Sequence, residues 1–191
     1  MRIVGGRYGG RLLLVPEGRT VRPTADRARE SIFNILEHNE LRLDRRPNIK
    51  DLRVLDGFAG TGAYGLEALS RGAAHAVFID RDLSTCRRNL FSLALEKSAT
   101  LIVGDCLKPP KATRACDLVF LDPPYRAGVA AQAISALAAA GWIADGGLVV
   151  VEMDAKAEFK PPAKFKRMDD RRYGAARIAV LLYEPNAAPA A

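Results

Sequence analysis

Short apolar runs alternate with amphipathic segments along most of the chain. The runs with the length and composition of buried strands are RVLD, AVFID, TLIVGD, CDLVFLD and GLVVVE. The segments between them that show helical periodicity are AYGLEALSRG, LSTCRRNLFSLALEK and VAAQAISALAAAGW. Apolar strands that alternate with helices form βαβ units. The pattern therefore predicts an α/β fold with a mostly parallel sheet that is covered by helices on both faces.

The N-terminal end departs from this alternation. Its first residues predict two short strands, RIVG and RLLLV, which are joined by the turn sequence GRYGG. The run ADRARESIFNILEH then has one apolar helical face, and Thr24 is a suitable N-cap for this helix. We therefore expect a small β-hairpin arm, followed by a helix that begins the main domain.

The C-terminal end also departs from the alternation. KFKRMDDRRYG and ARIAVLLYE follow each other without a helix between them, which predicts an antiparallel hairpin. The final NAAPAA has the composition of a disordered tail. Together, these features divide the chain into a basic arm (residues 1–22), an α/β domain (residues 23–184) and a tail (residues 185–191).

Length and composition are typical of a soluble protein with one domain. The chain has 191 residues, of which 49% are hydrophobic and 27% are charged. It contains no apolar run near the roughly 20 residues that cross a bilayer, and no signal-peptide core near its start. Its three cysteines and two histidines lack the spacing of metal ligands. We therefore expect a cytoplasmic monomer with reduced cysteines, no bound metal and no membrane contact.

Positive charge gathers near the two ends of the chain. Residues 1–29 contain seven arginines against two acidic residues, and residues 156–172 contain seven basic residues against three acidic ones. Residues 30–155 are slightly acidic. Two basic segments that flank an acidic domain predict either a surface for a phosphate-rich partner or a solubilising face.

A glycine-rich loop follows the first strand of the α/β domain. In DGFAGTGAYG, Gly60, Gly62 and Gly65 fit the pattern G-x-G-x-x-G at a strand-to-helix junction, where glycine permits a tight turn and close approach to a ligand. Asp80 ends the next strand, 20 residues after Gly60, where its carboxylate can bind ribose hydroxyls. These residues predict a site for an adenosine-containing cofactor, either a dinucleotide or S-adenosylmethionine (SAM).

Two further acidic residues bear on the choice between these cofactors. Asp56 precedes the glycines, where its charge would repel the pyrophosphate of a dinucleotide but would attract the ammonium group of SAM. Asp105 follows the third strand, where it either accepts a hydrogen bond from the adenine amino group or simply closes a turn. Asp56 therefore favours SAM, whereas the role of Asp105 stays open between an adenine contact and a turn.

The motif Asp122-Pro123-Pro124-Tyr125 follows the buried strand DLVFL, at the edge where open α/β sheets bind ligands. The prolines remove backbone donors, so the Asp122 carboxylate and the Pro123 carbonyl are left as acceptors. The exocyclic amino group of a base can donate to both, and Tyr125 can stack on a flipped-out base. The motif predicts direct methyl transfer from SAM to such a nitrogen, with positioning as the main source of rate.

The chain resembles the RsmD family of bacterial 16S ribosomal RNA guanine-N2 methyltransferases from residue 1 to about residue 184. The segments that carry this resemblance are RIVGGRYGGR…RPTADRARESIFNIL, DGFAGTGAYGLEALSRGA, FID and DPPY. The resemblance implies a Rossmann-like SAM-dependent methyltransferase fold with seven strands, of which the last is antiparallel. It also implies SAM as cofactor and a guanine of 16S ribosomal RNA, in the small ribosomal subunit, as substrate.

Together with the residue patterns, the resemblance implies roles for individual side chains. The expected cofactor site consists of Asp56, Gly60, Gly62, Asp80 and Asp105. The expected catalytic residues at the target base are Asp122, Pro123 and Tyr125. The expected substrate contacts are Arg2, Arg7, Arg11, Arg22, Thr24 and Pro124.

Three other functions fit part of the same pattern. A DNA adenine-N6 methyltransferase would use the same acceptor motif, but the chain has no recognisable target-recognition domain for DNA. A nicotinamide-dependent oxidoreductase would use the glycine loop, but Asp56 and DPPY disfavour it. An RNA-binding module without catalytic activity would leave the SAM site and DPPY without a use.

Overall fold

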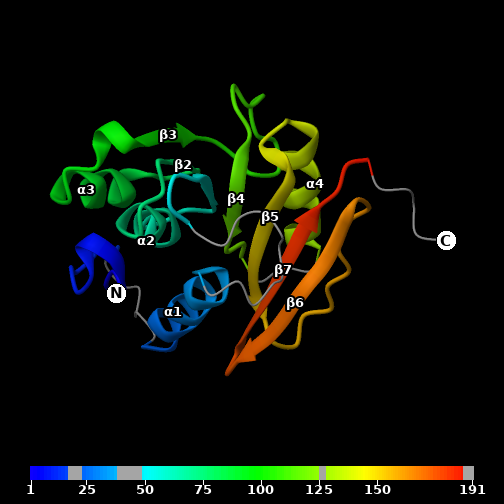
Figure 1. The fold of residues 1–191 in the computed structure, drawn as a ribbon, viewed down its shortest axis with the longest axis horizontal. Coiled ribbons are helices and arrows are strands. Elements are labelled where there is room, and N and C mark those ends of the chain that lie inside the picture. The colour runs from blue at the N-terminus through cyan, green and yellow to red at the C-terminus, as the bar shows by residue number, and fades with distance from the viewer. Residues whose placement is uncertain (17–22, 38–48, 125–127, 187–191) are drawn as a thin grey trace.

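Apolar runs with alternating helices build a seven-stranded sheet in the order β3-β2-β1-β4-β5-β7-β6 (Figure 1). This computed structural model describes residues 1–16, 23–37, 49–124 and 128–186. The strands are β1 (Arg53–Gly57), β2 (His75–Asp80), β3 (Ala99–Val103), β4 (Cys116–Leu121), β5 (Ile143–Asp154), β6 (Phe165–Tyr173) and β7 (Ala176–Tyr183). The helices are α1 (Pro23–Glu37), α2 (Ala63–Ser70), α3 (Ser84–Ser92) and α4 (Val129–Ala139), with short 3-10 turns η1 (Gly6–Tyr8) and η2 (Glu96–Ser98).

The sheet is parallel from β3 to β5 and becomes antiparallel at β7. β7 pairs with β5 on one side and with β6 on the other, and it is antiparallel to both. The last strand is therefore inserted between two strands that precede it in sequence. This arrangement confirms the predicted mostly parallel sheet, the antiparallel last strand and the C-terminal hairpin.

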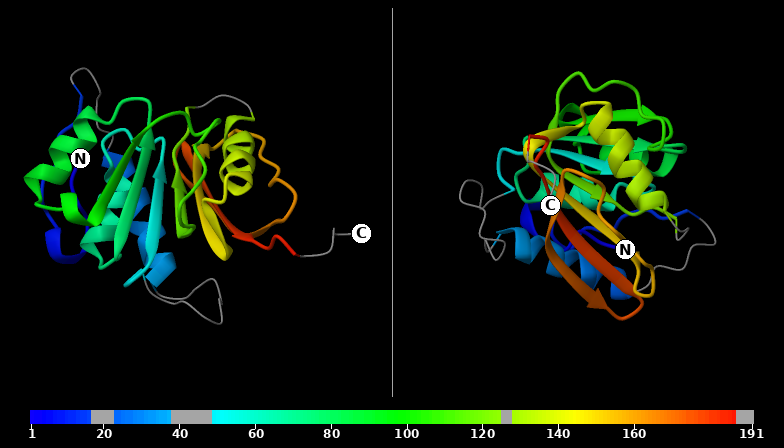
Figure 2. Two further views of the ribbon diagram at one scale, coloured as in Figure 1. Left: turned by 90° about the horizontal axis from the view of Figure 1, so that it is seen from above. Right: turned by 90° about the vertical axis from the view of Figure 1, so that its right-hand side faces the viewer.

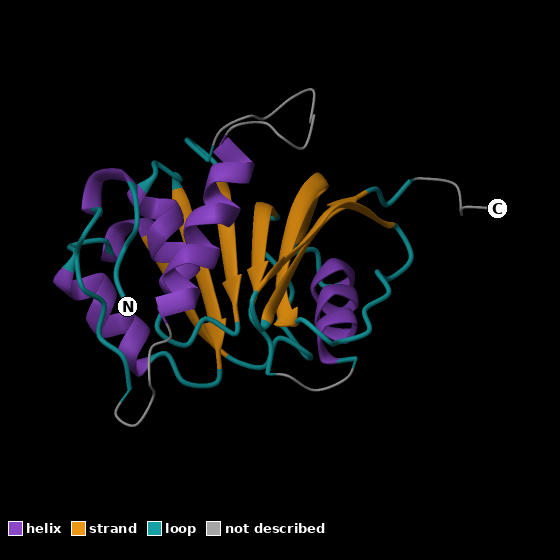
Figure 3. Ribbon diagram, turned by 90° about the horizontal axis from the view of Figure 1, so that it is seen from below, coloured by secondary structure: helices purple, strands orange, loops and turns teal. Residues whose placement is uncertain are grey.

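Helices cover both faces of the sheet (Figures 2 and 3). α1, α2 and α3 pack on one face, where their apolar residues share a core with residues of the strands such as Phe78, Phe120 and Val180. α4 packs on the other face with Ile134 and Leu137. The central strands β1, β2 and β4 are thus buried on both sides, which explains why their sequences are largely apolar instead of alternating, whereas no residue of the edge strands β3 and β6 is fully buried.

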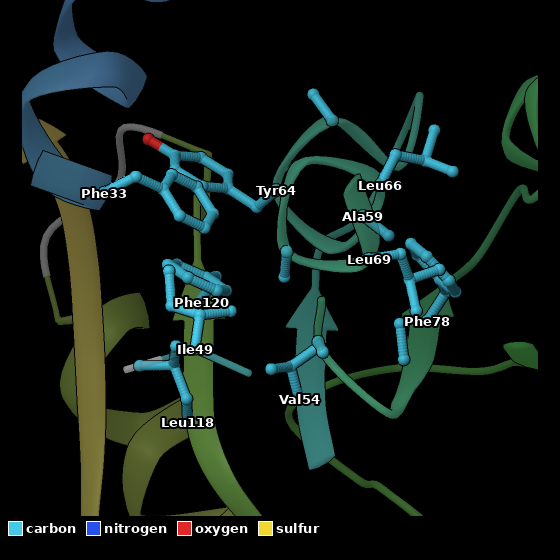
Figure 4. Close-up of a cluster of buried hydrophobic side chains, with 14 of the residues drawn as sticks. Phe33, Ile49, Val54, Ala59, Tyr64, Leu66, Leu69, Phe78, Leu118 and Phe120 are labelled. Atoms are coloured by element: carbon cyan, nitrogen blue, oxygen red, sulfur yellow. The ribbon is translucent and has the colours of Figure 1, made fainter. Parts of the chain in front are cut away.

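Aromatic packing joins α1 and α2 to the middle of the sheet. The ring of Phe120 on β4 stacks on Phe33 of α1 with a centroid separation of 5.2 Å, and on Tyr64 of α2 at 5.0 Å (Figure 4). The predicted apolar face of α1 is buried as expected. The helix begins two residues earlier than predicted, at Pro23 instead of Ala25, so Thr24 lies within its first turn instead of preceding it.

The N-terminal segment does not form the two predicted strands. Its ends meet in a single antiparallel bridge between Arg2 and Leu12, around the short turn η1. Gly6 has a φ of +71°, and a Cβ there would lie 2.0 Å from the Ser70 carbonyl oxygen, so the chain bends tightly over the end of α2. The two segments still pair around this bridge, since Ile3 N–H donates to the Arg11 carbonyl at 3.0 Å and Leu13 N–H to the Met1 carbonyl at 3.1 Å. The next amides, those of Val4 and Gly5, donate to Glu67 of α2 instead, so the pairing does not extend into the two predicted strands.

Glu67 of α2 accepts these hydrogen bonds. Its side chain is fully buried, and its carboxylate accepts from the amides of Val4 at 2.7 Å and Gly5 at 2.8 Å. Two buried arginines balance its charge, since Arg71 Nε lies 2.8 Å and Arg29 Nε 3.7 Å from its oxygens. A buried charge with this many partners holds the N-terminal segment, α1 and α2 together.

We expect Glu67→Ala to lower the free energy of unfolding by about 3–5 kcal/mol, because it leaves Arg29 and Arg71 buried with one partner fewer and removes the acceptor of two amides. Urea denaturation followed by circular dichroism measures this loss. Glu96→Ala, at an exposed glutamate of η2, is the control and should change the free energy by less than about 0.5 kcal/mol. Equal stability of the two variants would contradict the role of Glu67.

Candidate active site

The parallel strands end at one edge of the sheet, and a cleft opens there. Asp56 lies near the end of β1, Asp80 ends β2, and Asp105 and Asp122 follow β3 and β4. All four residues line the same cleft, whose volume is about 980 Å³. The structure therefore gathers the four acidic residues that the sequence predicted for the cofactor and the target base.

The glycine loop between β1 and α2 forms part of the cleft wall. Gly60 and Gly62 have φ angles of +52° and +80°, which residues with a side chain rarely adopt. A Cβ at Gly65 would lie 2.3 Å from the ring of Phe78, so this glycine lets α2 approach β2 closely. The Gly60 amide donates a hydrogen bond of 2.8 Å to Asp80 Oδ2. The loop is thereby fixed against the end of β2.

Asp56 is the most buried acid of the cleft, with only 3% of its surface exposed. Its Oδ2 accepts a hydrogen bond of 2.9 Å from the Gly65 amide in the first turn of α2. Burial, together with the charges of Asp122 and Asp80, nevertheless raises the pKa of Asp56 from 3.8 to about 8. A cation placed here would relieve this repulsion, so the cleft is suited to a positively charged group.

Asp105 lies at the more open side of the cleft. Its Oδ2 accepts from Arg81 Nη2 at 2.7 Å, and its Oδ1 accepts from the Leu107 amide at 2.9 Å. The hydrogen bond from Arg81 holds the pKa of Asp105 below its usual range. An ionised carboxylate has about four lone-pair sites, so Asp105 can accept a further hydrogen bond from a ligand.

The segment after β4 presents acceptors to the same cleft. Asp122 and Pro124 are exposed, Pro123 is buried, and all three residues line the cleft. Asp122 and Asp56 line the same cleft, and the charge of Asp122 contributes to the raised pKa of Asp56. Tyr125 lies outside the described residues, so its stacking on a base stays a prediction.

Two residues of the cleft were not singled out from the sequence. The Tyr64 hydroxyl donates a hydrogen bond of 2.6 Å to Glu152 Oε2, and both residues line the cleft. Burial, followed by the charges of Glu152 and Asp122, raises the pKa of Tyr64 well above its usual value. The sequence did offer one signal: Glu152 interrupts the apolar strand run VVVEMD at the edge where the other acids lie.

The predicted RNA-contact residues are only partly described. Arg2, Arg7 and Arg11 have exposed side chains on the N-terminal segment. Arg22 and the side chain of Thr24 lie outside the described residues. Met1, at the start of the same segment, lines the cleft. The exposed arginines are therefore carried by a segment that borders the candidate active site.

The second basic segment is partly neutralised by its own acids. Asp170 pairs with Arg167 at 3.2 Å and with Arg177 at 2.7 Å. Asp169 pairs with Arg171 at 2.8 Å. Much of the positive charge of β6 is thus neutralised by ion pairs within the hairpin. The N-terminal segment is therefore the better candidate for phosphate contacts.

The three cysteines are free thiols in buried positions. Burial raises the pKa values of Cys106 and Cys116 to about 12, so both are protonated at neutral pH. Within the described ranges, His, Cys, Asp and Glu side chains form no group that could hold a metal ion. Likewise, no helix in the described part of the chain is long and apolar enough to cross a membrane.

Comparison with curated proteins gives matches over most of the chain. The "Ribosomal RNA small subunit methyltransferase D" of Escherichia coli K12 is 40% identical over 158 residues, which are 81% of this chain and 75% of the relative. The protein of the same name from Haemophilus influenzae is 33% identical over 181 residues, which are 91% of this chain and 89% of the relative.

Comparison with solved structures and with family descriptions agrees with these matches. A structure described as "Putative methyltransferase yhhF from Escherichia coli" aligns with a TM-score of 0.79 and 34% identity, and covers 96% of this chain and 98% of its own. The family described as "Conserved hypothetical protein 95" matches residues 1–182. These matches confirm the resemblance to RsmD, and the chain belongs to the conserved hypothetical protein 95 family.

Proposed function

We propose that the chain is a SAM-dependent methyltransferase that modifies the exocyclic N2 amino group of a guanine in 16S ribosomal RNA of the small subunit. The observation that carries this proposal is the acceptor segment after β4, which lies in the same cleft as Asp56 and Asp80. The small-subunit ribosomal RNA methyltransferases named above, at 33–40% identity, support the substrate class.

The residues of the cleft fit SAM. Asp80 has a carboxylate at the end of β2 for the ribose hydroxyls, and Asp105 has acceptor capacity for the adenine amino group. Asp56 lies in an acidic, buried position that suits the ammonium group of the methionine part. The backbone of Gly60 and Gly62 provides close approach without side chains. When bound, SAM supplies an electrophilic methyl group on a positively charged sulfur.

The acceptor segment orients the target nitrogen. The Asp122 carboxylate and the Pro123 carbonyl accept hydrogen bonds from the two N–H groups of the guanine N2, which directs the nitrogen lone pair towards the methyl carbon. With the amino group held in this way, bound SAM would supply the methyl group and leave as its demethylated product, and the nitrogen would release its proton to water. Tyr125 is proposed to stack on the flipped-out base. Positioning provides most of the rate, so no covalent nucleophile is needed.

The N-terminal segment is proposed to bind the RNA backbone. In this proposal the arm covers residues 1–22, the catalytic domain residues 23–184 and the tail residues 185–191. The substrate contacts are Arg2, Arg7, Arg11, Arg22, Thr24 and, beside the base, Pro124. We further propose that the enzyme is a cytoplasmic monomer.

We expect Asp122→Ala to lower turnover by about 100- to 1,000-fold, because the amino group loses its acceptor, while the affinity for SAM changes by less than about threefold. Labelled SAM and small subunits that lack the modification measure turnover, mass spectrometry of the nucleosides identifies the product, and calorimetry measures SAM binding. Asp145→Ala, at an exposed position of β5, is the control. Full turnover in Asp122→Ala, or a methyl group on another atom, would refute the proposal.

We expect Asp56→Asn to have opposite effects on stability and on binding. Because the folded pKa of about 8 lies above the ordinary value of 3.8, the buried charge destabilises the SAM-free protein increasingly from about pH 4 to about pH 8. The amide still accepts from the Gly65 N–H. The variant should therefore be more stable by about 1–3 kcal/mol near pH 9, and equally stable near pH 4.

The same Asp56→Asn variant should bind SAM about 10- to 150-fold more weakly, because the ammonium group loses a charged partner. Thermal unfolding at several pH values measures the stability, and calorimetry measures the affinity. An unchanged SAM affinity would show that Asp56 does not contact the ammonium group, and a stability gain that is independent of pH would show that its charge is not the cause.

We expect the combined change of Arg2, Arg7 and Arg11 to alanine to reduce the salt dependence of RNA binding. Each phosphate contact contributes about −0.7 to −0.9 to the slope of log affinity against log salt, so the slope should flatten by about two to three units. Filter binding at several salt concentrations measures the slope. Substitution is a cleaner test than truncation, because Ile3 and Leu13 of this segment are buried in the core.

A matched charge control is available away from this segment. Lys108, Lys111 and Arg114 are exposed in the loop before β4, and their change to alanine removes the same charge. This control should leave the slope within about one unit of the wild-type value. An equal flattening in both triple variants would show that only the net charge matters and would refute a specific role for the N-terminal arginines.

A further inference from the structure

Glu152 lies beside the proposed acceptor of the target base. β4 and β5 are parallel, and their last paired residues are Leu121 and Val151. The next residues along these neighbouring strands are Asp122 and Glu152. Residues in register on parallel strands point to the same face of the sheet. Both side chains accordingly line the cleft.

Tyr64 holds the Glu152 carboxylate in one orientation. Its hydroxyl donates to Oε2 at 2.6 Å, and its ring is fixed by stacking on Phe120, with an interplanar angle of 16°. Burial, then the charges of Glu152 and Asp122, raises the pKa of the Tyr64 phenol, so it remains a donor at neutral pH. Among the described residues, Tyr64 is the one donor to this carboxylate. Oε1 is therefore available to a ligand in the cleft.

The Watson–Crick edges of the bases differ next to the amino group. In guanine, N2 is followed by N1–H, which is also a donor. In adenine and cytosine, the amino group is followed by a ring nitrogen with a lone pair. A flipped-out base is recognised by hydrogen bonds to this edge. A second carboxylate beside Asp122 therefore accepts from guanine, but it repels the ring nitrogen of adenine or cytosine.

We propose that Glu152, held by Tyr64, selects guanine by accepting a hydrogen bond from its N1–H while Asp122 holds the 2-amino group. This inference rests on the proposed function and extends it to the choice of base. Glu152 acts in recognition and not in methyl transfer itself. The alternative is a structural role, in which the hydrogen bond between Tyr64 and Glu152 only joins α2 to β5.

A substrate analogue separates these two roles. 2-Aminopurine keeps the 2-amino group but has a lone pair on N1 in place of the N–H. The probes are small-subunit ribosomal RNA with guanine at the modified position, and the same RNA with 2-aminopurine there. The wild-type enzyme should prefer guanine by at least about 100-fold in kcat/KM, because a site built to bind an N–H rejects an analogue that lacks it.

The preference should shrink to less than about tenfold in Glu152→Gln, whose amide can also donate to the N1 lone pair. Tyr64→Phe, which frees the carboxylate, should reduce the preference about threefold to tenfold. The matched control is Glu158→Gln, at an exposed glutamate after β5, which should keep the wild-type preference. Calorimetry should show the same SAM affinity in all three variants.

The outcomes separate this inference from the proposed function. If the wild-type enzyme methylates no guanine N2, the proposed function itself fails. If it does so, but Glu152→Gln retains a preference within about threefold of the wild-type value, the specificity role is overturned. A purely structural bond would lower the melting temperature of Glu152→Gln and Tyr64→Phe without changing the preference. If Glu152→Gln does not fold, the preference of Tyr64→Phe decides, and a value equal to that of the wild type overturns the inference.

Discussion

The candidate active site depends on one constraint of the fold. Its residues are far apart in sequence, and they share one site because the strands that carry them end at the same edge of the sheet. From β3 to β5 the strands run in one direction. Asp80, Asp56, Asp122 and Glu152 therefore meet across four adjacent strands. Three other features hold the elements that border this edge. The glycine loop is hydrogen-bonded to Asp80 at the end of β2, Tyr64 is hydrogen-bonded to Glu152 of β5, and the N-terminal segment is hydrogen-bonded to Glu67 of α2.

Gathering acids in this way has an energetic cost, and the two buried acids near α2 deal with it differently. Glu67 is surrounded by two amides and two arginines, so its charge is compensated within the protein. Asp56 has one backbone donor and two nearby acids, so its negative charge is not compensated. Its burial and these acids raise its pKa. The first acid stabilises the fold. The second acid carries a negative charge that the protein does not compensate, and a cationic ligand would stabilise it.

Periodicity and turn chemistry predicted a mostly parallel sheet, a C-terminal hairpin and the edge that carries the site, whereas the seven strands with an antiparallel last strand were implied by the resemblance to RsmD. They could not predict the hydrogen bonds from the N-terminal amides to Glu67. The local sequence around a glutamate in an apolar helix does not indicate partners that lie more than 60 residues away. The pairing of Tyr64 with Glu152 was missed for the same reason, since 88 residues separate them. The N-terminal pairing is shorter than predicted because the amides of Val4 and Gly5 donate to Glu67 of α2 instead of to the opposite segment. Local sequence patterns predict the secondary structure elements, but they contain no information on which distant residues these elements bring into contact.

The position of β7 in the sheet determines which strand edges are open before the fold is complete. β7 follows β6 in sequence but lies between β6 and β5. Until Ala176–Tyr183 is in place, β5 exposes an open edge and β6 has no neighbour in the sheet. Open strand edges pair readily with other chains. A chain that lacks this strand therefore presents the edge of β5 for pairing with other chains, and insertion of β7 closes that edge.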